Sequence, residues 1–150
     1  MNINNSNVDL QINAFLSSAP RYKLVVLAAD PSMPVADSID LGKELSEVIS
    51  GIDRSNDVHF QFAVQDAIDE VISKNIRNDA DFGRYIILEN PGILFEPALN
   101  LDVCNLLKSI SKNTLVILLW PGVIRQDRLC FLSESSDLYI SQSDINYAII

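Results

Sequence analysis

Three apolar runs, each closed by turn-forming residues, most strongly limit the folds open to this chain. They are Tyr22–Ala29, Arg84–Glu89 and Thr114–Trp120. Short and nearly unbroken apolar runs of this kind are typical of strands that are buried on both faces. Such strands occur in parallel sheets covered by helices. The sequence therefore predicts an α/β fold with these three runs in the central sheet.

Apolar residues at helical spacing occupy much of the chain between these runs. Helices are predicted at residues 7–18, 41–51 and 57–74, and between the expected caps Asn100 and Asn113. Short strands are predicted at residues 35–41, 128–132, 137–141 and 144–150. The order of elements predicts one three-layer domain over residues 1–150, with a mostly parallel sheet and a β-rich C-terminal extension.

The charge balance limits the class of partner. The net charge is −9, from 11 Lys and Arg against 20 Asp and Glu. This argues against direct nucleic-acid binding, which needs a basic surface. Solubility accounts for the acidity. The alternative is that the outer face of helix 57–74, with Asp66, Asp69 and Glu70, docks a basic protein partner.

Hydropathy and cysteine usage bear on the compartment. No apolar run approaches the roughly 20 residues of a membrane span, and the N-terminal residues lack the basic start and apolar stretch of a secretory signal. These features predict a cytoplasmic protein without membrane contact. Cys104 and Cys130 both fall in apolar patterns, so we expect them to be reduced core residues.

Glu89 stands where α/β sheets place functional groups, just past the C-terminal end of a buried strand. Asn90, Pro91 and Gly92 end the strand immediately after it. A strand that ends in a carboxylate has the form of a Walker B element, whose acid holds Mg²⁺ or polarises a water beside a nucleotide phosphate. Glu89 is therefore the first candidate site residue.

Several short segments also occur in an order and spacing that match one family. They are Leu41–Ser46, Ile87–Asn90, Leu94–Pro97, Leu106–Asn113 and Trp120–Gly122, followed by a β-rich tail that contains tyrosine. In these features the chain resembles BrxF, a family of small P-loop proteins encoded with type 3 bacteriophage exclusion (BREX) systems of bacteria. The resemblance covers roughly residues 38–150 and the helix and strand before Asp30. It implies a P-loop NTPase fold with a phosphate-binding loop after the first strand.

The segment after the first strand departs from that family's pattern. A Walker A loop needs glycines whose N–H groups wrap the phosphates, a Lys for the β- and γ-phosphates, and a Ser or Thr for Mg²⁺. Residues 30–34 instead carry two prolines, and no glycine lies between Tyr22 and Leu41. The stretch is also too short for the helix of a usual parallel crossover. Asp30 and Asp37 would repel phosphate further, so the sequence predicts a degenerate Walker A.

The Gly42-Lys43 pair matches part of the Walker A pattern. However, Glu44 replaces the hydroxyl residue, and Asp37 stands where the leading glycine belongs. The pair also falls inside a helical pattern and not at a strand-to-helix turn. We therefore interpret Lys43 and Glu44 as solvent-facing helix residues.

The remaining polar and aromatic candidates give weaker signals. Glu89 and Glu96 could form a catalytic carboxylate pair, but a loop intervenes. A capping role for Glu89, with Asn90 orienting the turn, fits better. His59 has no cysteine or second histidine at metal-ligand spacing. Trp120 could line a cleft, although an aromatic at the rim of the core is the commoner arrangement.

The resemblance and the degenerate loop together predict a noncatalytic pseudo-NTPase, without cofactor or metal. It would be a subunit of a multiprotein antiphage defence system that acts through contacts with other protein subunits. The alternative is a nucleotide-binding protein or weak NTPase for ATP or GTP with Mg²⁺. Glu89 would then be the metal-side acid, with Asp30, Asn90 and Trp120 near the nucleotide. A third hypothesis is a small-molecule sensor with a cleft beyond Glu89 and Trp120.

Overall fold

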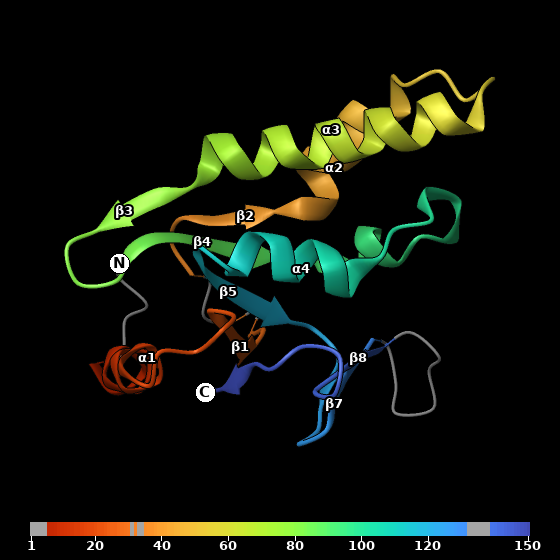
Figure 1. The fold of residues 1–150 in the computed structure, drawn as a ribbon. Coiled ribbons are helices and arrows are strands. Elements are labelled where there is room, and N and C mark those ends of the chain that lie inside the picture. The colour runs from red at the N-terminus through yellow and green to blue at the C-terminus, as the bar shows by residue number, and fades with distance from the viewer. Residues whose placement is uncertain (1–5, 31, 33–34, 132–138) are drawn as a thin grey trace.

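A computed structural model describes residues 6–30, 32, 35–131 and 139–150. These residues form a six-stranded sheet in the order β2-β4-β5-β1-β9, with β3 also paired to β4, and a separate three-stranded sheet in the order β6-β7-β8 (Figure 1). In the large sheet every pairing is parallel except β3 with β4, whereas the small sheet is antiparallel. The predicted α/β class, the mostly parallel sheet and the β-rich character of the C-terminal region are confirmed.

The three predicted central strands lie side by side. They are β1 (Leu24–Ala28), β4 (Gly83–Glu89) and β5 (Leu115–Trp120), with β5 in the middle. All six residues of β5 are buried, as its unbroken apolar sequence requires. Each strand ends where the sequence places a turn residue or a change to polar residues.

Shorter strands complete the edges of the large sheet. The strand β2 (Ser38–Asp40) pairs with the carboxyl half of β4, and β3 (Arg77–Asp79) pairs with its amino half. On the other side, β9 (Ala148–Ile149) pairs with β1. The predicted strand at 35–41 is therefore present in shorter form, whereas β3 lies in a segment that the sequence assigned to a polar connection.

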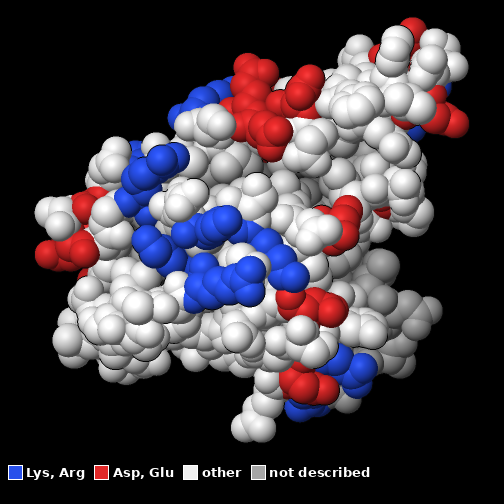
Figure 2. Space-filling view, in the orientation of Figure 1, with Lys and Arg blue, Asp and Glu red and all other residues white. Residues whose placement is uncertain are grey.

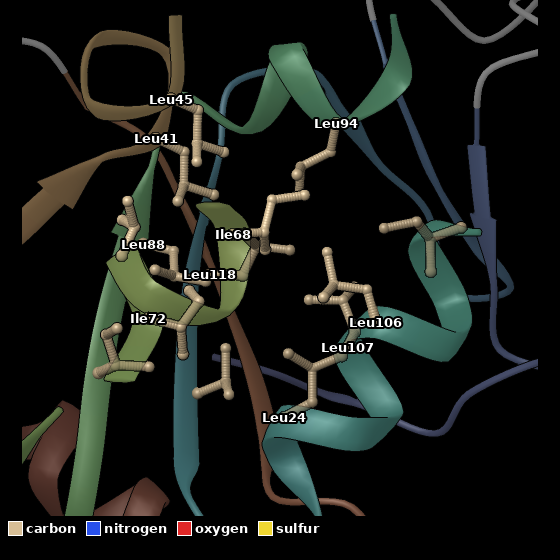
Figure 3. Close-up of a cluster of buried hydrophobic side chains, with 14 of the residues drawn as sticks. Leu24, Leu41, Leu45, Ile68, Ile72, Leu88, Leu94, Leu106, Leu107 and Leu118 are labelled. Carbon is tan, nitrogen blue, oxygen red and sulfur yellow. The ribbon is translucent and has the colours of Figure 1, made fainter. Parts of the chain in front are cut away.

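Helices cover both faces of the large sheet. The helices α2 (Leu41–Ser50), α3 (Asp57–Asn75) and α4 (Val103–Ser111) share one core with the strands (Figures 1 and 3). The helix α1 (Ser6–Ser17) packs on the opposite face through the fully buried Ile12. The arrangement has three layers, as predicted, with side chains of α2, α3, α4 and the strands converging in the larger core (Figure 3).

Side-chain caps fix the starts of three helices. Asp40 accepts a hydrogen bond from the Lys43 N–H at the start of α2. At the start of α3, the Asn56 side chain accepts one from the His59 N–H. Asp102 caps α4, so the predicted cap Asn100 is wrong. Asn100 instead follows a 3₁₀ helix, Pro97–Leu99, and its left-handed backbone (φ 48°) turns the chain before α4 begins. The predicted C-terminal cap, Asn113, is also wrong, because Lys112 caps the helix.

The connection from β1 to β2 crosses the sheet without a helix in the part that is described, which comprises residues 29, 30, 32 and 35–37. Val35 packs against the core on the α1 face. Val35 therefore lies on the side of the sheet away from α2, α3 and α4. Pro31, Met33 and Pro34, on which the sequence argument partly rests, lie outside the described residues.

The C-terminal region divides between the two sheets. The small sheet comprises β6 (Val123–Ile124), β7 (Arg128–Cys130) and β8 (Tyr139–Ser141). Two of the predicted short strands are thus present in part, while residues 132 and 137–138 lie outside the described residues. The predicted strand at 144–150 is reduced to β9, which belongs to the large sheet because the Ile150 N–H bonds to the Val26 carbonyl (3.0 Å). None of the helices described is both long enough and apolar enough to cross a membrane.

Candidate functional site

The carboxyl ends of β1, β2, β4 and β5 bring most of the candidate residues to one side of the sheet. We call this region the carboxyl edge and define it by the residues that end or follow these strands. They are Asp30, Asp40, Glu89, Asn90 and Trp120. Ligands of open α/β sheets bind outside this edge, so its chemistry decides whether a nucleotide site is plausible.

Glu89 is half-buried at the end of β4. In the parallel β2–β4 register it stands directly opposite Asp40. Its carboxylate accepts no hydrogen bond from the residues that the structure describes. The prediction that Glu89 caps a loop by hydrogen bonds is therefore wrong, because the neighbouring Asp40 fills that role. Glu96, the other member of the predicted pair, lies exposed between two 3₁₀ helices.

Asp40 organises the carboxyl edge. One of its oxygens, Oδ1, accepts both the Lys43 N–H (2.9 Å) and the Asn90 side-chain amide (2.9 Å). Asn90 reaches this position from a left-handed backbone conformation (φ 51°), which Asn tolerates better than most residues. Sequence analysis missed Asp40, although an Asp just before the first apolar residue of a helix is a standard start signal.

Gly42 makes room for this arrangement. A Cβ atom at this position would collide with the Asn90 side-chain amide. The Gly42-Lys43 pair lies in the first turn of α2 and directly follows β2, so its predicted position away from a strand-to-helix junction is wrong. The reason is that Asp40 both ends the strand and caps the helix, which leaves no loop between them. Lys43 is exposed, as predicted, whereas Glu44 is half-buried.

Asp30 lies exposed after β1 and is engaged in a local turn. Its Oδ1 accepts hydrogen bonds from the Ser32 hydroxyl (2.6 Å) and the Ser32 N–H (2.9 Å). These two bonds, the hydroxyl one first, lower the pKa of the Asp30 carboxyl below its ordinary value. Asp30 therefore stays negative at neutral pH, which disfavours a phosphate beside β1.

Trp120 lies inside the core and does not line a cleft. Its side chain is 1% exposed, and its indole N–H donates to the Cys130 carbonyl (3.0 Å). Phe95 packs edge-on against it at 5.9 Å between ring centroids, and Phe131 does so at 6.3 Å. Phe95 thus packs under the loop that follows β4, as its apolar character between Leu94 and Glu96 favours. No face of the Trp120 ring is available to a nucleotide base.

A shallow hollow of about 440 Å³ lies near the start of α4, between α4 and β8. It is lined by Phe95, Asn100, Leu101, Asp102, Val103, Cys104 and Tyr139. Cys104 is half-buried there, so the prediction that it is a core residue is wrong. Cys130 is buried in β7, which confirms the prediction for that residue. Burial, followed by the charges of Asp144 and Asp102, raises the pKa of the Cys104 thiol. The thiol is therefore protonated at neutral pH and is a poor nucleophile.

A second candidate surface runs along the outer side of α3. Val58, Phe62, Gln65 and Asp69 follow one another at spacings of four, three and four residues, so they form one stripe. We call this stripe the α3 surface. Val58 is 60% exposed and Phe62 is 67% exposed, and Gln65 donates a hydrogen bond to Asp69 (3.0 Å). One half of the stripe is thus apolar, and the other half is polar and acidic.

Metal-binding potential is weak in the part of the chain that the structure describes. No group of three or more His, Cys, Asp or Glu side chains there is placed to hold a metal ion. His59 is exposed in the first turn of α3, where its backbone N–H donates to Asn56 (3.1 Å).

Comparisons of the chain with protein-family models, with curated proteins and with solved structures return no match.

Proposed function

We propose that this chain is a noncatalytic, BrxF-like subunit of a bacterial antiphage defence system, which acts through protein contacts on a P-loop-like scaffold without a phosphate loop. The resemblance of its short motifs suggests the system, and the carboxyl edge suggests the loss of catalysis. The fold class is compatible with a P-loop ancestry, because a carboxylate ends a buried parallel strand beside the strand that follows α4.

The observation that carries the proposal is the closed start of α2. A phosphate site at a helix start needs free backbone N–H groups. Here the Lys43 N–H is bound by Asp40, and the Asn90 amide occupies the space beside Gly42. The two carboxylates in register, Asp40 and Glu89, add negative charge at the same place. A nucleotide triphosphate would have to displace this network against that charge.

The α3 surface supplies the contact region in this proposal. Adjacent exposed apolar side chains next to polar ones are typical of helix faces that bind another protein. An isologous dimer through this stripe is disfavoured. In an antiparallel pair centred on Phe62, the apolar Val58 of one copy would face Asp66 of the other. The stripe fits a partner segment with an apolar anchor and a basic end better.

The test is co-expression of the chain with the products of the genes adjacent to its own, followed by size-exclusion chromatography. We expect a stable complex that Phe62→Asp weakens at least tenfold, because a charge would be buried in an apolar contact. Leu10→Asp is the matched control, since Leu10 on α1 is also 67% exposed. Failure of every pair to co-elute, or equal losses with both variants, would contradict the proposal.

The nucleotide-binding alternative rests on one observation, the half-buried Glu89 beside Asp40. Two neighbouring carboxylates at the carboxyl ends of parallel strands are an arrangement that could hold Mg²⁺. The melting temperature with Mg²⁺ and ATP or GTP separates the two functions, because a ligand of the folded state raises it. We expect no rise. A rise that Glu89→Gln abolishes would establish the alternative.

A further inference from the structure

Positive side chains gather on one part of an otherwise acidic molecule. Lys and Arg gather over and beside α4, whereas Asp and Glu lie over α3, toward the margins and at one side of the blue group (Figure 2). Contacts and strand register bring four of these cations together near the end of α4. We call them the basic patch, which consists of Arg21, Arg84, Lys108 and Lys112. This patch is distinct from both the carboxyl edge and the α3 surface.

Tyr22 is the centre of the basic patch. The Arg21 guanidinium carbon lies 5.4 Å from the centroid of the Tyr22 ring, and Lys108 Nζ lies 5.9 Å from it. Lys112 is one helical turn beyond Lys108, whose carbonyl accepts its N–H (3.1 Å). The aromatic ring thus holds two cations by cation–π attraction, with a third cation next to them.

The strand register adds Arg84 to this group. The β4–β5 and β5–β1 pairings place Arg84 level with Tyr22, two strands away, at the amino ends of the strands. Adjacent strands are about 4.8 Å apart, so the two backbones are about 10 Å apart. Side chains alternate along β4. Arg84 therefore shares the face of Ile86, which belongs to the core beneath α4.

Among the described residues, no carboxylate forms an ion pair with the basic patch. Lys108 and Lys112, four residues apart on one helix, repel each other. The helix dipole favours cations at the end of α4, but it does not explain Arg21, which lies in the segment before β1, or Arg84, which lies in β4. The patch is therefore open to an external anion.

The composition of the patch indicates the class of that anion. Protein interfaces have an apolar centre and are depleted in Lys, and surface-binding membrane segments insert apolar side chains. Every large apolar side chain that is exposed among the described residues lies outside the patch. These are Leu10, Val48, Val58, Phe62, Tyr139 and Ile149. Binding to nucleic-acid phosphates, in contrast, depends mainly on Lys and Arg.

We propose that the basic patch binds the sugar–phosphate backbone of nucleic acid without reading its sequence. The net charge of −9, which led to the opposite expectation, averages over the whole surface. At physiological salt the Debye length is about 8 Å, so the carboxylates on distant faces are largely screened at the patch. The proposal does not depend on the proposed function, because the surface is a different one.

The test measures fluorescence anisotropy of a labelled 20-base-pair duplex of random sequence over a series of salt concentrations. We expect the double variant Lys108→Gln/Lys112→Gln to bind at least about tenfold more weakly at 50 mM salt and to have a salt slope lower by roughly 1.8, because two phosphate contacts are lost. Lys43→Gln/Arg54→Gln is the matched control, since it removes the same charge from α2 and the loop after it. It should retain the wild-type slope.

Three outcomes would overturn the proposal. The first is absence of duplex binding by the wild-type protein at 50 mM salt. The second is an equal loss of affinity in the two double variants, which would mean that only total charge matters. The third is equally tight binding of a polyglutamate peptide of the same charge, which would assign the patch to an acidic protein. Unchanged melting temperatures in both variants show that folding is intact.

Discussion

The two ends of the central sheet differ in charge and in openness. At the carboxyl edge, Asp30, Asp40 and Glu89 are acidic, and Asn90 closes the start of α2. At the amino end, the basic patch surrounds Tyr22 and forms no ion pair with a carboxylate of the described residues. Open α/β sheets usually bind ligands at the carboxyl ends of their strands. In this molecule the basic patch lies at the opposite end.

This contrast extends to packing. At the carboxyl end the fully buried Trp120 lies against the half-buried rings of Phe95 and Phe131. In the basic patch at the amino end, the half-buried Tyr22 lies against Arg21 and Lys108. Burial stabilises in proportion to the apolar area removed from water. The carboxyl end should therefore contribute more to stability and the amino end more to recognition.

The strongest test of this contrast is loss of the aromatic cluster. Trp120→Ala should lower the free energy of unfolding by about 3–5 kcal/mol, because it removes a fully buried ring and its hydrogen bond to Cys130. Tyr22→Ala should lower it by only about 1–2 kcal/mol. Urea denaturation followed by circular dichroism measures both. Equal losses would show that the two ends are packed alike.

A second test concerns Tyr147, directly before β9. Its hydroxyl is buried and has no hydrogen-bond partner among the described residues, and burial, followed by the charges of Asp127 and Cys130, raises its pKa to about 12. Folding favours the neutral phenol. The contribution of Tyr147 to the free energy of unfolding is therefore complete below about pH 10 and is lost as the pH rises toward 12.

Tyr147→Phe removes both the unpaired hydroxyl and its titration. We expect it to be neutral or stabilising by about 1 kcal/mol at pH 7, because the unpaired hydroxyl is gone. Relative to the variant, the wild type should lose a further 2–3 kcal/mol or so between pH 10 and 12. Urea titrations at pH 7, 10 and 11.5 measure the difference. If the free energy of unfolding depends on pH in the same way in both proteins, the Tyr147 hydroxyl is not buried.

The smallest expected effect lies at the closed start of α2. Replacing Gly by Ala inside a helix normally stabilises by about 1 kcal/mol. Gly42→Ala should instead destabilise by about 1–2 kcal/mol, because its methyl group meets the Asn90 amide. In the Asn90→Gly background, Gly42→Ala should stabilise. A double-mutant cycle in urea measures this coupling, and additive effects would show that Asn90 does not close the site.

Hydrophobic pattern predicted most of the large sheet and its helices. The runs that became β1, β4 and β5 are apolar over nearly their whole length, and α2 and α3 begin at the predicted residues. The strand β3 could not be found this way, because Arg77–Asp79 is polar and is a strand only through its pairing with β4. The position of β9 beside β1 likewise depends on a contact between distant segments.

The candidate site was less predictable than the fold. Glu89 was correctly placed at a strand end, but only the register of β2 with β4 shows that Asp40 stands beside it. The basic patch combines residues from β4, α4 and the segment before β1, which no sequence window contains. The net charge does not reveal the basic patch, because the 20 acidic residues outnumber the 11 basic ones over the whole chain.

The position of β1 between β5 and β9 has a consequence for the order of folding. Its two neighbours, β5 and β9, both lie late in the chain, and most of the sequence separates β1 from them. Contacts between such distant segments slow folding, because the intervening loop must be closed before any pairing is gained. During synthesis, Leu24–Ala28 therefore has no strand to pair with until β5 has been synthesised. This apolar segment is then the part of the nascent chain most in need of protection from aggregation.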